Sequence, residues 1–308
     1  MTIATPVVLL FGPTAVGKTD VLTRLASLPI EVINADSMQV YRGMDIGTAK
    51  PDPEFLATLP HHLIDILDPH ERFDVGRFVE LADSCIDAIA ARGRIPIVSG
   101  GTGYYFRHLL FGLPDSPQIE PAVRDRLQRE LEAEGLRALR ERLERVDPES
   151  ASRIEPTDPY RIVRALEIYE QTGVPRSAFR VSQQPRCTLA ATIIELVRDR
   201  EELRARIAER VTAMFAAGLR EEVESLVDRG VTACDPGMRA IGYREFFRPD
   251  GSLYGADRDA DIQTRSITAT RRYAKRQVTF FRGLPGRVSV HADDVPRVER
   301  LVRDAWRP

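Results

Sequence analysis

Cysteine is scarce in this 308-residue chain. The three cysteines, Cys85, Cys187 and Cys234, lie far apart and show neither Cys-x-x-Cys nor Cys/His ligand spacing. This excludes a disulfide framework and a cysteine zinc site, and it favours a reducing compartment. The chain also lacks an 18-residue apolar run and a basic, cleavable leader, so we expect a cytoplasmic protein that neither spans a membrane nor is secreted.

An excess of one charge is also absent. With 44 Lys and Arg against 46 Asp and Glu, the formal net charge is -2 and the pI is near 6.3. These values exclude a uniformly basic polyanion binder, so any nucleic-acid affinity must come from local clusters. No internal repeat or low-complexity tract is present, and 43% hydrophobic residues are enough for a globular core.

Short apolar runs alternate with helical patterns in the first hundred residues. PVVLLF at 6–11, IEVINAD at 30–36 and IPIVSGG at 95–101 are typical of buried parallel strands. A helical pattern begins at Thr19, and another spans 78–92. This order predicts an α/β fold with a doubly wound parallel sheet.

The composition changes after Leu113, where PDSPQIEP leads into a charged, helix-favouring stretch at 122–146. Helical patterns continue to a polar segment at 177–186, and TLAATIIELV then returns the chain to a strand. We therefore predict a P-loop core made of 1–113 and 189–308, ending in basic helices, and an inserted, mainly helical domain at 114–188.

A phosphate-binding motif lies between the first predicted strand and helix. GPTAVGKT fits G-x-x-x-x-G-K-[ST] in the context that the motif requires. Such a loop turns backbone N–H groups toward phosphate oxygens, Lys18 adds a positive charge, and the Thr19 hydroxyl can ligate Mg²⁺. The motif predicts a di- or triphosphate site formed by Gly12, Pro13, Thr14, Ala15, Val16, Gly17, Lys18 and Thr19.

Two further segments follow predicted strands and should lie at the same sheet edge. Asp36 is a candidate base or metal ligand there, although an Asp-Ser pair is equally suited to capping a turn. Gly100-Gly101-Thr102-Gly103 can present amides and a hydroxyl to a ligand, or can simply form a tight turn.

Basic residues cluster between Thr264 and Arg282, a stretch without any acid. On a helical wheel Arg265, Arg272 and Arg276 share one face, and Ile267, Ala274, Val278 and Phe281 lie opposite. The basic face either is a solvated surface or binds a polyanion. Further candidates for phosphate contacts are Arg161, Arg164, Arg239 and Arg244.

Seven segments together resemble the bacterial tRNA dimethylallyltransferases, also called delta-2-isopentenylpyrophosphate tRNA-adenosine transferases, over almost the whole chain. In the family's order they are GPTAVGKT, INADSMQVYRGMDIGTAKP, HHLIDILDP, GGTGYYF, DPYRIVRALEIYEQTG, AIGYRE and RRYAKRQVTFF. The resemblance implies transfer of a dimethylallyl group from dimethylallyl diphosphate to N6 of the adenosine 3′-adjacent to the anticodon, with release of diphosphate. We also expect Mg²⁺ bound at Thr19, no membrane partner, and a monomer.

The same resemblance assigns roles to individual residues. Asp36 is expected to be the base, Lys18, Thr19 and Arg210 to act on the diphosphate, and Thr102 to lie near the adenosine. The domain at 114–188 is expected to contact tRNA. The implied tRNA-binding residues are Asp36, Ser37, Met38, Gln39, Thr102, Arg124, Tyr160, Arg161, Arg164, Arg239, Gly242, Tyr243, Arg244, Arg272, Lys275, Arg276 and Gln277.

The sequence departs from the family pattern at two positions: Phe280 replaces a frequent tryptophan, and Tyr160 a common glutamine. The 308 residues show no zinc-finger spacing like that of eukaryotic members, so we expect a bacterial-type enzyme that works without that module. Two alternatives stay open. An adenylate isopentenyltransferase would not need 114–188 or the acid-free helix, and a P-loop kinase or NTPase that binds ATP would transfer phosphorus instead.

Overall fold

The computed structural model describes residues 4–114 and 119–306. It divides into two compact units, one made of Met1–Leu110 with Arg186–Pro308 and the other of Phe111–Pro185. The sequence places this division at 114–188, and residues 115–118 of that predicted boundary lie outside the described residues.

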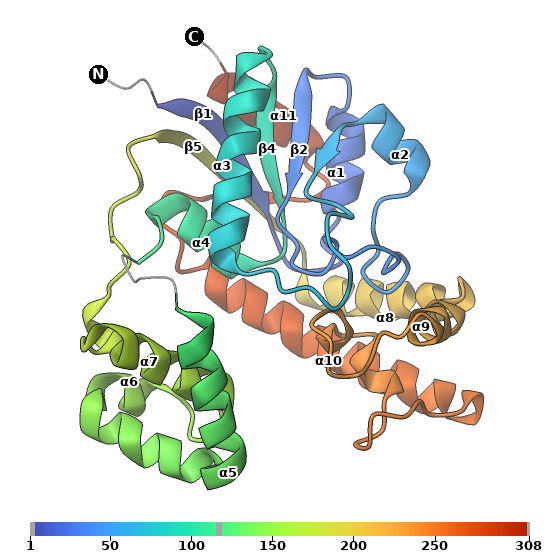
Figure 1. Cartoon of the computed structure of the whole chain (residues 1–308). Coiled ribbons are helices and arrows are strands. Elements are labelled where there is room, and N and C mark those ends of the chain that lie inside the picture. The colour runs from blue at the N-terminus through green and yellow to red at the C-terminus, as the bar shows by residue number, and fades with distance from the viewer. Residues whose placement is uncertain (1–3, 115–118, 307–308) are drawn as a thin grey trace. The chain divides into compact units, whose positions relative to one another are not determined.

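A six-stranded sheet forms the centre of the first unit (Figure 1). Its order is β3-β2-β4-β1-β5-β6, and every neighbouring pair is parallel. This confirms the predicted parallel α/β sheet. The strands are β1 (Thr5–Phe11), β2 (Ile30–Asn34), β3 (His61–His62), β4 (Ile95–Gly100), β5 (Leu189–Val197) and β6 (Val288–His291).

Both faces of the sheet are covered by helices, which is why β1 and most of β4 are apolar. Val8 and Leu10 of β1 share a buried cluster with residues of α1 (Lys18–Leu25) and α11 (Val295–Ala305). On the opposite face α3 (Val75–Ala91) contacts β1, β2 and β4, and Phe106 of α4 (Gly103–Phe111) packs on Phe11. Figure 1 shows α3 in front of the strands and α11 behind them.

A second group of helices packs beyond the carboxyl ends of the strands. The long helix α10 contacts α8, and its Phe281 stacks on Phe11 of β1. A separate apolar cluster joins Leu226 of α9 to Met44 and Phe246. The elements of this group are α8 (Arg200–Ala216), α9 (Leu219–Asp228), the short helix η4 (Ala256–Arg258) and α10 (Asp259–Phe281). Helix α2 (Pro53–Thr58) lies beside α1 instead (Figure 1), and its Phe55 packs against the cluster that contains α1.

The second compact unit is helical in its described part. It contains α5 (Pro121–Val146), α6 (Pro148–Arg153), α7 (Pro159–Thr172) and the short helix η1 (Arg176–Ala178). Asp147 and Asp158 cap α6 and α7 by accepting hydrogen bonds from the backbone N–H groups of Ser150 and Arg161, and each is followed by proline at the first helical position. The Asp-Pro pairs therefore start new helices, as capping chemistry predicts. The apolar side chains of this unit form their own core.

Some elements escape the sequence patterns. The adjacent histidines His61 and His62 are as typical of a loop as of a strand, yet they form β3 beside β2, where His62 Nε2 lies 2.7 Å from Glu31 Oε2. A two-residue strand is too short to show a period. Strand β6 and helix α11 are not predicted either. Among the described residues, no helix is long and apolar enough to cross a membrane.

Candidate active site

The carboxyl ends of β1, β2 and β4 meet at one edge of the sheet, because the strands are parallel. Each of these strands continues into one of the predicted functional segments: the glycine loop at 12–19, the Asp36 turn at 35–39 and the glycine turn at 100–103. The structure therefore brings together three motifs that lie far apart in the sequence.

The glycine loop turns sharply before α1. Gly17 has a φ of 109°, in the left-handed region that favours glycine, and Ala15 has a φ of 63°. Lys18 begins the helix, and its side chain folds back over the loop, where Nζ donates to the carbonyl oxygens of Gly12 (3.0 Å) and Pro13 (3.1 Å). The ammonium is thereby held against the loop.

The environment of Lys18 is unusual for an ammonium group. Its pKa is lowered to about 8, chiefly by burial and also by the positive charge of Arg210, while the negative charge of Asp36 acts in the opposite direction. Lys18 is thus a partly desolvated cation, a state that an incoming anion would relieve.

The outer side of the loop is fixed by two arginines from the β5–α8 region. Arg206 donates to the Ala15 carbonyl (3.0 Å), and Arg198 donates to the Val16 carbonyl (3.1 Å). These contacts occupy carbonyl oxygens and leave the N–H side of the loop open. Among the described residues, no acceptor is present for the backbone N–H groups of Ala15, Gly17, Lys18 and Thr19.

The Asp36 turn has one engaged and one open carboxylate oxygen. Oδ1 of Asp36 accepts from the Met38 N–H (2.9 Å), so this residue does cap its turn. Within the described residues Oδ2 has no hydrogen-bond partner. The neighbouring Ser37 N–H donates to Thr102 Oγ1 (3.1 Å), which ties the turn to the segment after β4. Capping and a chemical role are therefore compatible here.

Close backbone packing explains the glycines after β4. A Cβ atom at Gly100 would lie 2.3 Å from the backbone of Ala35, and one at Gly101 would lie 2.5 Å from Gln277 Nε2. Neither position can hold a larger residue without displacement. The glycines thus bring Thr102 against the Asp36 turn, and the Thr102 N–H donates to the Ala35 carbonyl (3.1 Å).

Gln277 of α10 joins two of the loops. Its Oε1 accepts from the Thr14 N–H (2.9 Å), and its Nε2 donates to the Gly101 carbonyl (2.7 Å). Gln277 is only 4% exposed, a placement that fits a role in holding the loops better than the predicted contact with RNA. Tyr273, one turn earlier on the same helix, takes part in this arrangement, because its hydroxyl contacts Thr102 and Gln277.

Arg210 is a partly buried cation on α8. Among the described residues it has neither a hydrogen-bond acceptor nor an ion-pair partner. Burial lowers its pKa, while the charge of Asp36 raises it and that of Arg206 lowers it. Arg210 also lines a hollow of about 450 Å³ together with Lys50 and Met214. A guanidinium in this situation is available to an anionic ligand.

The exposed side of α10 carries three cations, Arg272, Lys275 and Arg276. Within the described part of the chain none of them forms an ion pair, and together with Thr279 and Phe280 they line a hollow of about 500 Å³. Arg265 differs from them, because it contacts Asp261 and the Glu245 carbonyl. The predicted basic face is therefore available only in the second half of the helix.

The remaining predicted RNA contacts fall into two groups. Near η2 (Gly237–Arg239) and η3 (Arg244–Phe246), Arg239 and Arg244 are exposed, but Gly242 and Tyr243 are buried. The Tyr243 hydroxyl donates to Glu222 Oε1 (2.6 Å), so this side chain does not face solvent as a direct RNA contact would. Gln39, in the Asp36 turn, likewise makes its contacts within the protein, since its Nε2 donates to the carbonyls of Thr48 and Ala49.

The other group belongs to the unit at 111–185. Arg124 and Arg164 both pair with the buried carboxylate of Glu167. Arg161 pairs with Asp158 at the start of α7, and Tyr160 is 73% exposed. This unit therefore presents one aromatic ring and several arginines at its surface.

A metal ion would find few protein ligands at the sheet edge. Among residues 4–114 and 119–306, no three His, Cys, Asp or Glu side chains are grouped as a metal site. The Thr19 hydroxyl is exposed and has no hydrogen-bond partner in the described structure. A single hydroxyl ligand fits Mg²⁺, which usually keeps several waters and takes phosphate oxygens from its substrate.

Together, the parallel sheet and the loops that follow its strands define an α/β protein with its candidate site at the carboxyl edge, where open α/β sheets generally bind their ligands. The family model described as IPP transferase matches residues 39–284. The chain therefore belongs to the IPP transferase family, a family of prenyltransferase enzymes. This confirms the resemblance found in the sequence.

Individual relatives agree with this assignment. The tRNA dimethylallyltransferase of Thioalkalivibrio sulfidiphilus is 47% identical over 91% of this chain and 88% of its own length. That of Thermus thermophilus is 46% identical over 91% and 90%. The crystal structure of the tRNA isopentenylpyrophosphate transferase of Bacillus halodurans is 34% identical, covers 98% of this chain and 97% of its own, and has a TM-score of 0.68. A eukaryotic dimethylallyltransferase acting on tRNA gives a TM-score of 0.77 at 27% identity, over 97% of this chain and 76% of its own.

Proposed function

We propose that the chain transfers a dimethylallyl group from dimethylallyl diphosphate to N6 of the adenosine 3′-adjacent to the anticodon in tRNA, and that diphosphate is released. The observation that carries this proposal is the set of glycine-loop N–H groups for which residues 4–114 and 119–306 offer no acceptor. They lie beside the cations of Lys18 and Arg210 and the Asp36 oxygen that has no partner in the same ranges. An anion site next to a carboxylate suits a reaction that expels diphosphate and removes a proton.

The glycine loop acts as a P-loop for the leaving group. As the allylic C–O bond breaks, negative charge grows on the diphosphate, and the loop N–H groups, Lys18 and Arg210 stabilise it. Arg198, Arg206 and Gln277 hold the loop from outside, so its N–H groups need little rearrangement during the reaction. Mg²⁺, held by Thr19 and the diphosphate, would supply further charge neutralisation when bound.

Asp36 acts on the acceptor substrate, the N6 amine of the adenosine. The N6 amine is a weak nucleophile, because its lone pair is delocalised into the adenine ring. As N6 bonds to the allylic carbon, the amine loses a proton, and Oδ2 of Asp36 accepts it. Thr102 is fixed against the same turn and lies where it can orient the adenine ring.

Recognition of tRNA depends on the exposed cations of α10 and on the helical unit at 111–185. Phosphate contacts position an RNA, whereas bases in a loop can be turned out and enclosed by protein. Arg272, Lys275 and Arg276 have no acidic partner among the described residues, so a polyanion can engage them. The domain at 111–185 adds Tyr160 and Arg161 as surface contacts.

The reaction itself separates this proposal from its alternatives. Unmodified tRNA is incubated with labelled dimethylallyl diphosphate or with labelled ATP, and the anticodon-loop nucleosides are analysed by mass. The proposal expects an isopentenyl adenosine only with the prenyl donor. Prenylation of free AMP alone would support an adenylate isopentenyltransferase, and release of phosphate from ATP without prenylation would support a kinase or NTPase.

Charge reversal on α10 should weaken tRNA binding. In the double variant Arg272→Glu/Arg276→Glu, we expect the dependence of the tRNA association constant on salt to become less steep. The magnitude of the slope of log K against log salt should decrease by about 2, since each lost phosphate contact removes about one released counterion. Binding is measured by fluorescence anisotropy between low and moderate salt. Arg300→Glu/Arg303→Glu on α11 changes the net charge equally at exposed positions and serves as control. An identical slope in both double variants would contradict this placement of the RNA.

Binding of diphosphate should weaken as the pH rises through about 8, where Lys18 loses its proton. Below that pH the ammonium is charged and attracts the anion, and above it the attraction is lost. Titration calorimetry with inorganic diphosphate is carried out from about one pH unit below this pKa to about one and a half units above it, on the wild type and on Lys18→Met. Because diphosphate itself titrates, the expected result concerns the ratio of the two affinities, which should approach one at high pH. A constant ratio would exclude Lys18 from the site.

A further inference from the structure

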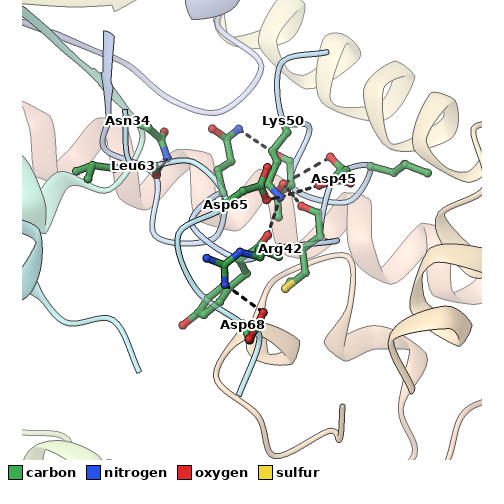
Figure 2. A network of polar contacts seen from close by, with 12 residues as sticks. Asn34, Arg42, Asp45, Lys50, Leu63, Asp65 and Asp68 are labelled. Atoms are coloured by element: carbon green, nitrogen blue, oxygen red, sulfur yellow. Dashed lines mark hydrogen bonds and ion pairs between the residues drawn. The ribbon is translucent and has the colours of Figure 1, made fainter. Parts of the chain in front are cut away.

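Lys50 lies at the centre of a polar network beside the active-site turn (Figure 2). Its side chain is 4% exposed, and Nζ donates to the Tyr41 carbonyl (2.6 Å), to Asp45 Oδ1 (2.6 Å) and to Asp65 Oδ1. It is one of only three lysines among 44 basic residues. Three acceptors that converge on one nitrogen suit an ammonium, whose donors radiate from one atom, better than a planar guanidinium.

The acceptors of Lys50 belong to separate segments of backbone, and two of these segments contain unusual conformations. Ala49, Leu63 and Asp65 have φ values of 48°, 64° and 53°, in the left-handed region. Such conformations in residues other than glycine persist only where surrounding contacts enforce them, and they gather at functional sites. Lys50 links these residues by its position next to Ala49 and its contact with Asp65.

These segments are connected to the turn that carries Asp36. Asn34 accepts from the Asp36 N–H (3.2 Å) and donates to the Leu63 carbonyl (3.1 Å). Gln39 donates to the Ala49 carbonyl (3.1 Å), directly before Lys50. The backbone on both sides of the Asp36 turn is therefore bonded to segments that Lys50 holds together.

The far end of this network is fixed to α9. Glu222 accepts from the N–H groups of Asp45 (2.9 Å), Ile46 (2.7 Å) and Gly47 (3.2 Å), and from the Tyr243 hydroxyl. This carboxylate anchors the segment just before Lys50 to a helix. Because this segment is fixed at its far end, a change in the position of the Lys50 side chain would shift the backbone of the Asp36 turn.

We propose that Lys50 is a positioning residue for the reaction, and that its ammonium fixes the backbone around Asp36 so that Oδ2 meets the N6 proton. This inference rests on the proposed role of Asp36. The contacts of Lys50 are to protein, so its loss should act on turnover and not on affinity. A misplacement near 1 Å can lower a rate by about 100-fold.

Lys50→Met tests the proposal, because it keeps the aliphatic stem and removes the three hydrogen bonds. Single-turnover prenylation of tRNA is measured together with the dissociation constants of tRNA and inorganic diphosphate. We expect the rate to fall by about 10- to 100-fold while both dissociation constants stay within about threefold. Arg42→Met is the matched control: it removes the exposed Arg42–Asp68 ion pair from the same loop, and it should change the rate by less than about twofold.

Asp65→Ala provides a second variant if Lys50→Met does not fold, because Asp65 is 45% exposed at its side chain. It removes one acceptor and should lower the rate by a smaller factor, again at unchanged affinity. A wild-type rate in the folded variants, or a loss of affinity equal to the loss of rate, overturns the positioning role. Failure of the wild type to prenylate tRNA would instead overturn the proposed function.

Discussion

Asp36→Asn is expected to lower the rate of prenyl transfer by about 10²- to 10⁴-fold, the range for loss of a general base. The substitution is nearly isosteric, and the amide oxygen can still accept the Met38 N–H that closes the turn. It removes the negative charge and the basic oxygen, however. The N6 proton would then have no acceptor as the new N–C bond forms.

Single-turnover rates and tRNA dissociation constants of the wild type, Asp36→Asn and Asp36→Ala separate chemistry from structure. Asn keeps the turn and Ala does not, so a similar loss of rate in both points to the missing base. tRNA affinity should stay within about threefold for Asp36→Asn, since phosphate contacts dominate binding. Turnover near the wild-type level in Asp36→Asn would remove this residue from the role of base.

The parts of the site that follow strands could be predicted from local sequence. Lys18, Asp36 and Thr102 each come shortly after an apolar run that is typical of a buried strand, and parallel strands end at one edge. The apolar pattern of buried strands and the shared edge of parallel strands therefore place three distant segments side by side. The roles that the family resemblance gives these residues remain predictions, which the experiments above address.

Helix α10 shows where such reasoning fails. The helical wheel separates a basic face from an apolar one, and Ala274 and Phe281 are indeed buried. It cannot show that a polar residue, Gln277, is also buried, because that depends on a free N–H at Thr14 and a free carbonyl at Gly101. Buried polar groups need partners, and these partners lie 263 and 176 residues away in sequence.

Lys50 and Glu222 were missed for the same reason. In the sequence Lys50 lies in an ordinary-looking turn, and Glu222 is one acid among several on an amphipathic helix. Only the folded chain shows that Glu222 accepts three consecutive backbone N–H groups and that Lys50 is enclosed by three acceptors. Spacing and periodicity report which face of an element is apolar, but not which distant backbone groups a side chain meets.

Arg210→Met is expected to lower kcat/KM for dimethylallyl diphosphate by about 10²- to 10³-fold, as when one donor to a developing negative charge is removed. Stability should behave differently. In the described structure Arg210 has no hydrogen bond or ion pair, and burial lowers its pKa. A partly buried cation without a partner is unfavourable, so replacing it with an apolar side chain of similar length should leave Tm unchanged or raise it.

The measurement combines steady-state kinetics with thermal unfolding in the presence and absence of inorganic diphosphate. Diphosphate should raise the Tm of the wild type, because a ligand that binds only the native state stabilises it, and should have little effect on Arg210→Met. Arg204→Met on the same helix is the control, since Arg204 is exposed and its ion-pair contact with Glu201 is a loose one of 3.7 Å. A variant with full kcat/KM and a lower Tm would show that Arg210 supports the fold. A lower kcat/KM with an equal or higher Tm would show that this arginine is kept, at a cost to stability, for the anion it binds.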